Sequence, residues 1–191
     1  MKTNKAAMFG LDARIALAIF GALSVISGVA LYSVIQQAKV TSFASEIIEL
    51  GKAVEQYTLD TSGGLPVSSA SASFKEIYEL TSSTKSGWNG PYFRFSDDAG
   101  SGVHYARHKN IFGTVSSVTI INRKKDRTSC VDLTDCYVWA TFNYIPESYG
   151  PNLKNYFDNT DDVSDVGISS VSTQSVGNIN FYYRIMPALS L

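Results

Sequence analysis

A run of uncharged residues near the N-terminus constrains this chain more than any other feature. From Ile15 to Ile35 the sequence reads IALAIFGALSVISGVALYSVI, without a single Asp, Glu, Lys or Arg. A helix over this run would be about 30 Å long, which matches the hydrocarbon core of a bilayer. The residues before the run carry three cations and one acid, namely Lys2, Lys5, Arg14 and Asp12. This bias predicts a cytoplasmic N-terminus, with the residues after the run outside.

The helical pattern continues beyond the apolar run. Apolar residues recur at steps of three and four: Val40, Phe43, Ile47, Leu50, Val54 and Tyr57. Such a stripe is typical of an amphipathic helix that buries one face. The first proline is Pro66. We therefore expect one helix of about fifty residues, apolar all round in its first half and amphipathic in its second half.

Two other interpretations of the apolar run remain open. Gly28-Val29-Ala30 supplies small residues suited to signal-peptide cleavage, which would release a soluble exported binding domain. Signal-peptide apolar cores usually have about 7 to 15 residues, however, and this run is longer. An uncut single-pass anchor that carries an adhesin or sensor domain is the other alternative.

The remainder of the chain predicts an α+β fold, with the long helix packed on an antiparallel sheet. We expect the helix over residues 11–60 and a β-rich head over residues 61–191, packed against residues 38–60. Five segments rich in β-branched and aromatic residues are strand candidates: Tyr92–Ser96, Val103–Arg107, Thr114–Asn122, Tyr137–Ile145 and Ile179–Met186. Between them we expect a loop over Val67–Ser73 and short helical segments over Phe74–Leu80 and Asn152–Phe157.

Charge and cysteine content narrow the class of protein. The formal net charge is −1, which argues against nucleic acid as a specific partner. The basic cluster from Arg123 to Arg127 is interrupted by Asp126, so a solvated turn is favoured over a binding patch. In an exported domain, Cys130 and Cys136 in a polar segment predict a local disulfide. In a reducing cytosol the same residues would be ordinary thiols.

Three segments together resemble a known family. They are the basic leader MKTNKAAMFG, the helix ending in YTLDTSGGLP from Tyr57 to Pro66, and GWNGPY from Gly87 to Tyr92. The sequence resembles type IV prepilins and type II secretion pseudopilins over residues 1 to about 95. The GWNGPY segment is similar to one common in the secretion-type pseudopilins.

The resemblance implies a structural subunit of a filament rather than an enzyme. A prepilin peptidase would cut between Gly10 and Leu11 and methylate the new amine. The subunit would wait as a single-pass protein of the inner membrane, and an assembly machinery would polymerise it with copies of itself and other pilin-like subunits. The periplasmic or extracellular filament would serve adhesion, motility, DNA uptake or protein secretion.

The sequence departs from the family pattern at the start of the mature chain. The family usually has a glutamate at the fifth mature position, where this chain has Ile15, and a phenylalanine at the first, where it has Leu11. Asp12 is the nearby acid and is our candidate counter-charge for the N-terminal amine. A subunit at a filament tip would not need that contact.

Four aspartates form a candidate metal site: Asp158, Asp161, Asp162 and Asp165. Calcium takes six to eight oxygen ligands from flexible acidic loops, and several secretion-type pseudopilins hold calcium in a late loop. The spacing does not match an EF-hand, and a solvated acidic turn is the alternative.

We find no catalytic constellation in the sequence. It has no Gly-x-Ser-x-Gly segment and no phosphate-binding loop. His104 and His108 are four residues apart, but they fall in a predicted strand and turn and have no third ligand nearby. An ordinary structural role is favoured over a zinc site.

Overall fold

The computed structural model describes residues 6–69, 71–96, 104–109, 111–113 and 115–190. Helix α1 spans Ala6–Thr61 without a break, which confirms the predicted long helix. The chain divides into two compact units, and the boundary between Ala38 and Lys39 falls inside α1. We call residues 12–38 of α1 the apolar half and residues 39–61 the head half. The first five residues of the predicted leader lie outside the described part of the chain.

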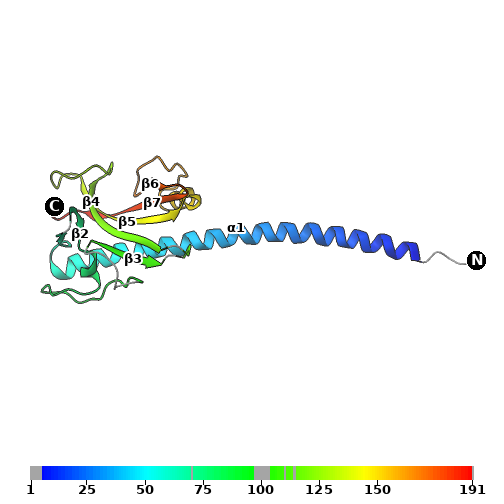
Figure 1. The fold of residues 1–191 in the computed structure, drawn as a ribbon, viewed down its shortest axis with the longest axis horizontal. Coiled ribbons are helices and arrows are strands. Elements are labelled where there is room, and N and C mark those ends of the chain that lie inside the picture. The colour runs from blue at the N-terminus through cyan, green and yellow to red at the C-terminus, as the bar shows by residue number, and fades with distance from the viewer. Residues whose placement is uncertain (1–5, 70, 97–103, 110, 114, 191) are drawn as a thin grey trace, which may run out of the picture. The chain divides into compact units, whose positions relative to one another are not determined.

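The head consists of the head half of α1, a sheet and short helices (Figure 1). After α1 come β1 (Val67–Ser68), β2 (Ser71–Lys75), the 3-10 helix η1 (Ile77–Leu80), β3 (Tyr105–Lys109), β4 (Val115–Lys124), β5 (Cys136–Pro146), the 3-10 helix η2 (Glu147–Tyr149), α2 (Gly150–Asp158), β6 (Ser169–Ser175) and β7 (Asn178–Pro187). Seven strands form one sheet in the order β1-β2-β4-β5-β7-β6, and β3 pairs with the first half of β4. Every pair is antiparallel, which confirms the predicted α+β architecture.

The predicted stripe of the head half is the centre of the hydrophobic core. All six of its members, from Val40 to Tyr57, are buried against the sheet. Phe43 packs edge-on against Phe112 and Phe142, with ring centroids 5.0 and 5.2 Å away. A Cβ on Gly51 would lie 3.2 Å from the ring of Tyr183 on β7, so the helix and this ring pack closely here.

Several sequence predictions of local structure were wrong. Tyr92–Ser96 is not a strand: its backbone runs along η1, where the amide of Tyr92 donates to the Leu80 carbonyl. The predicted loop at Val67–Ser73 contains β1 and the start of β2, and the predicted helix at Phe74–Leu80 is helical only in η1. Strand β6 was missed because its sequence, SSVSTQS, has little apolar content.

Candidate functional site

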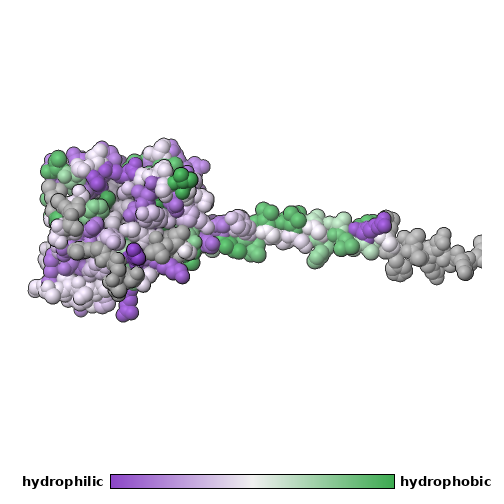
Figure 2. Space-filling view, viewed as in Figure 1, coloured by the Kyte–Doolittle hydropathy of each residue, from purple (hydrophilic) through white to green (hydrophobic). Residues whose placement is uncertain are grey.

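The apolar half of α1 is the most unusual surface of the molecule. Its large side chains are exposed all round: Phe20 is 71% exposed and Ile15 51%. Figure 2 shows this surface in green, the colour of high hydropathy. The most apolar window of the helix has a mean hydropathy of 2.2, and none of it is buried within the molecule. Among the described residues this is the one helix long and apolar enough to be a candidate membrane span.

One serine and two glycines of the uncharged run are compatible with burial in lipid. Ser33 donates its hydroxyl to the Ala30 carbonyl at 2.8 Å, so the hydroxyl is satisfied within the helix. A Cβ added to Gly21 or Gly28 would meet no atom within 4 Å. These two positions are open notches where a second helix could approach closely.

The predicted processing site lies in the first turns of α1. Gly10 is exposed, and a Cβ there would have no neighbour within 4 Å. Leu11 continues the helical backbone, and Asp12 is exposed on the next position. Within the described residues, no hydrogen bond or ion pair engages Asp12. Its role as a counter-charge therefore stays a prediction.

The GWNGPY segment, from Gly87 to Tyr92, packs against the C-terminal end of α1. Tyr92 donates its hydroxyl to Asp60 Oδ2 at 2.8 Å and accepts from the Asn89 amide at 2.8 Å. Trp88 donates its indole N–H to the Glu79 carbonyl at 3.1 Å. Gly87 has φ +86°, and a Cβ there would lie 2.1 Å from the Asp60 carbonyl oxygen. Only glycine permits this approach to the helix end.

Tyr57 anchors the same end from inside the core. It is fully buried and donates to Glu79 Oε2 at 2.9 Å. Burial and the bond to the Glu79 carboxylate raise the pKa of Tyr57 above its usual value, so the phenol remains a neutral donor. These contacts join η1 and the GWNGPY segment to the C-terminal end of α1.

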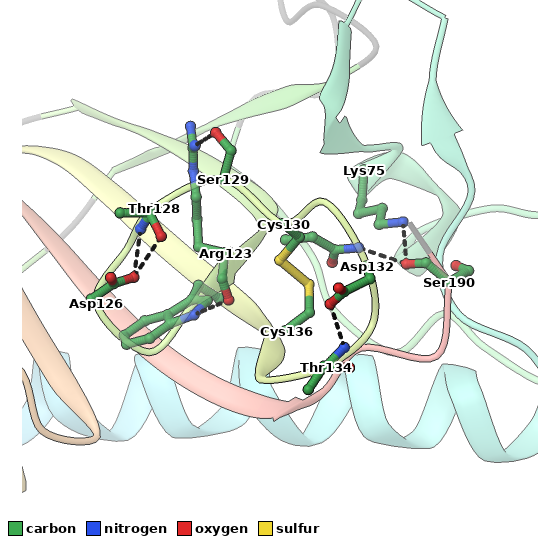
Figure 3. The surroundings of a disulfide bond; sticks show 12 residues. Lys75, Arg123, Asp126, Thr128, Ser129, Cys130, Asp132, Thr134, Cys136 and Ser190 are labelled. Atoms are coloured by element: carbon green, nitrogen blue, oxygen red, sulfur yellow. Dashed lines mark hydrogen bonds between the residues drawn. A yellow bond between two sulfur atoms is a disulfide. The ribbon is translucent and has the colours of Figure 1, made fainter.

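The predicted disulfide joins Cys130 and Cys136, with their Cα atoms 5.7 Å apart (Figure 3). Cys136 begins β5, and its carbonyl accepts from the Ala188 amide at 2.9 Å. The Ser190 carbonyl in turn accepts from Lys75 Nζ at 3.2 Å and Asn122 Nδ2 at 2.6 Å. The disulfide loop and the C-terminal segment are therefore tied into one edge of the head.

The structure does not bring the four aspartates together as a metal site. In the described part of the chain, no group of three His, Cys, Asp or Glu residues is arranged to hold a metal. Asp158 accepts from Lys154 Nζ at 2.6 Å and from the amides of Ile168 and Ser169. The other three aspartates are exposed. Among the described residues, the geometry favours the alternative of a solvated acidic turn.

Lys154 is the partner of Asp158 that the sequence analysis did not predict. It is completely buried, and its ammonium also donates to the Ser169 carbonyl at 3.1 Å. Burial alone would raise the pKa of Asp158, but the hydrogen bonds from Lys154, Ser169 and Ile168 outweigh it and lower that pKa. The sequence signal for this pair was the spacing of four residues between Lys154 and Asp158, which places two side chains on the same face of a helix.

His104 and His108 have different surroundings in the structure. His104 packs against Phe74, with ring centroids 4.9 Å apart. His108 places Nε2 3.5 Å from Glu46 Oε2 and lies near Phe93. Neither environment supplies a set of metal ligands within the residues described.

Comparison with known proteins identified no similar protein. No protein-family model, no curated protein and no solved structure matches the chain.

Proposed function

We propose that this chain is a structural subunit of a filament of the type IV pilus or type II secretion pseudopilus class. The observation that carries the proposal is the division of α1 into an exposed apolar half and a head half buried by its own sheet. A soluble core helix would be covered along its whole length. An exported binding domain would have no use for an apolar helix that continues directly into its core.

The apolar half explains how such a subunit could wait in the inner membrane and then polymerise. Its side chains leave lipid for the equally apolar helices of neighbouring subunits, so extraction from the bilayer exposes little apolar surface to water. Gly21 and Gly28 allow close helix contacts. A contact that repeats from subunit to subunit without closing produces a fibre.

Processing at Gly10 is the chemical step that the proposal requires. Removal of the leader takes away Lys2 and Lys5, two charges that could not enter a dry filament core. Methylation would then fall on the amine of Leu11, with Asp12 as its counter-charge in the absence of a glutamate at position 15. The partners are a prepilin peptidase, the assembly machinery of the inner membrane, and other pilin-like subunits.

The role of the filament depends on its outer surface. The GWNGPY segment favours a secretion pseudopilus, whereas the disulfide favours a pilus exposed at the cell surface. Adhesion, motility, DNA uptake and protein secretion are the functions open to this class. A structural role, not a catalytic one, is the proposal.

N-terminal sequencing and intact mass of the protein from its own cells test the proposal. We expect a mature chain that begins at Leu11 with a methylated amine. Gly10→Leu should trap the full-length form, while Gly21→Leu, at an equally open helical position, should be processed normally. A mature chain that begins after Ala30 would instead establish an exported domain. An unprocessed chain, unaffected by Gly10→Leu, would establish a simple membrane anchor.

A further inference from the structure

A small cavity lies where the end of α1, the sheet and the C-terminal segment meet. The space in it that is open to the centre of a water molecule is about 10 Å³, close to what a single internal water needs. Its polar walls are Thr58 on α1, Lys75 on β2, Asn122 on β4 and Ser190 after β7. The other walls are apolar side chains and Gly64. The four polar residues therefore decide what the cavity can hold.

Two of these polar side chains are buried and meet at one oxygen atom. Lys75 is 3% exposed and Asn122 is 8% exposed. Lys75 Nζ donates to the Ser190 carbonyl at 3.2 Å (Figure 3). Asn122 Nδ2 donates to the same carbonyl at 2.6 Å. Because both donors share one acceptor, the ammonium and the carboxamide lie close together.

These contacts leave buried hydrogen-bonding atoms without a partner. Asn122 Oδ1 is buried and accepts from no described residue. The Lys75 ammonium has three N–H donors, and among the described residues no acid pairs with it. Burial and the positive charge of Lys85 lower the pKa of Lys75, as expected for an ammonium removed from water. An unpaired buried donor and acceptor each cost free energy, so a ligand that satisfies both is favoured.

Thr58 supplies a second acceptor on the helix side of the cavity. It is 7% exposed, and its hydroxyl donates to the Val54 carbonyl of its own helix at 2.8 Å. This bond uses the hydroxyl proton and leaves the lone pairs of the oxygen to accept. The cavity thus combines one charged donor with two neutral acceptors.

This combination selects the kind of ligand. The Lys75 ammonium would repel a cation. An anion would face Asn122 Oδ1, which offers only lone pairs. A water molecule can accept from Lys75 and donate to both Asn122 Oδ1 and Thr58 Oγ1. Three hydrogen bonds are typical of an internal water, and the volume of the cavity leaves no room for a larger neutral ligand.

We propose that this cavity binds one internal water molecule that bridges Lys75 Nζ, Asn122 Oδ1 and Thr58 Oγ1. The water joins α1, β2 and β4 beside the carbonyl that holds the C-terminal segment. It gives the buried ammonium a second acceptor and the carboxamide oxygen its donor. The site belongs to the head alone and does not depend on the filament assignment.

A crystal structure of the full chain in detergent tests the proposal directly. We expect one electron-density peak at about 2.7–3.2 Å from both Lys75 Nζ and Asn122 Oδ1. The absence of a peak, at a resolution where other internal waters are visible, would overturn the proposal, and so would a side chain in that place. Crystals soaked in bromide separate water from an anion. An anomalous signal from bromide at the peak would also overturn the proposal.

Variants identify the groups that hold the water. Lys75→Met keeps the length of the side chain but removes the charged donor, so we expect the density peak to disappear. Lys85→Met makes the same change at an exposed lysine and should keep the peak. A peak that persists in Lys75→Met, or is lost in Lys85→Met, would overturn the role of Lys75.

Thr58→Val is a second variant that disturbs the fold less. It removes only the hydroxyl, whose bond lies within its own helix, and should lower the occupancy of the water peak. Full occupancy in this variant would overturn the role of Thr58. Thermal melting of each variant checks that the head remains folded.

Discussion

The two halves of α1 differ in apolar content and in what covers them. In the head half, Phe43 is fully buried between Phe112 and Phe142. In the apolar half, Phe20 is 71% exposed, and none of the most apolar window is buried. The head half has its partner within its own chain. Under the proposed function, the partner of the apolar half is lipid or the same helix of another subunit.

The largest expected effect comes from comparing one substitution in each half of α1. Phe43→Ala should lower the free energy of unfolding of the head by about 3–5 kcal/mol, because it leaves a cavity in the core. Phe20→Ala should leave that free energy unchanged. Denaturant unfolding in detergent, followed by tryptophan fluorescence, measures this directly, since Trp88 and Trp139 both belong to the head. An equal loss in both variants would contradict the division of α1.

A charge introduced into the apolar half should weaken membrane insertion and leave the stability of the head unchanged. Ile26→Arg should disfavour membrane insertion by about 2.5–3.5 kcal/mol, the cost of an arginine at the centre of a spanning helix. Head unfolding should not change. Membrane fractionation measures the first effect, with Ile26→Leu as the control. Normal insertion of the arginine variant would show that this surface does not enter lipid.

The head contains a buried ion pair, Lys154 with Asp158. Lys154→Met should lower head stability by about 3 kcal/mol, because it leaves the Asp158 carboxylate in a buried place without its cation. Lys52→Met, at an exposed position, is the matched control and should change little. Denaturant unfolding compares the two. A similar small effect in both would show that the pair is not important for folding.

The disulfide should affect the head alone. Cys130→Ser/Cys136→Ser should lower head stability by about 2 kcal/mol in the chain-entropy model, because the unfolded chain gains freedom. Membrane insertion should not change. Melting with and without reductant provides an independent measurement, and the double variant should be insensitive to reductant. A loss of insertion in this variant would mean that the two halves are coupled.

The smallest expected effect is a dependence on acid pH. The pKa of Asp158 is lower in the folded head than its ordinary value of 3.8, so the carboxylate stabilises the head above that pH. This contribution should be lost as the pH falls below 3.8 and through the lower folded pKa. Unfolding between pH 5 and 2 should therefore show a steeper loss for the natural chain than for Asp158→Asn. Parallel curves would contradict the role of Asp158.

The amino-acid sequence alone determined the features that depend on local periodicity. The uncharged run from Ile15 to Ile35 and the stripe from Val40 to Tyr57 predict the helix and its buried face, because helical spacing follows from backbone geometry. The short spacing of Cys130 and Cys136 predicts their disulfide in the same local way. The central strands β4 and β5 were also predictable, since they are rich in β-branched and aromatic residues.

Only the tertiary structure decided the features that depend on contacts between distant residues. Strand β6 is polar and forms because β7 offers it an edge to pair with. Tyr92–Ser96 resembles a strand, but its backbone bonds go to η1 instead. The aspartate series suggested calcium, whereas in the structure Asp158 pairs with Lys154 and the other three aspartates are exposed. Pairing and charge compensation join residues far apart in the chain, so sequence periodicity carries no record of them.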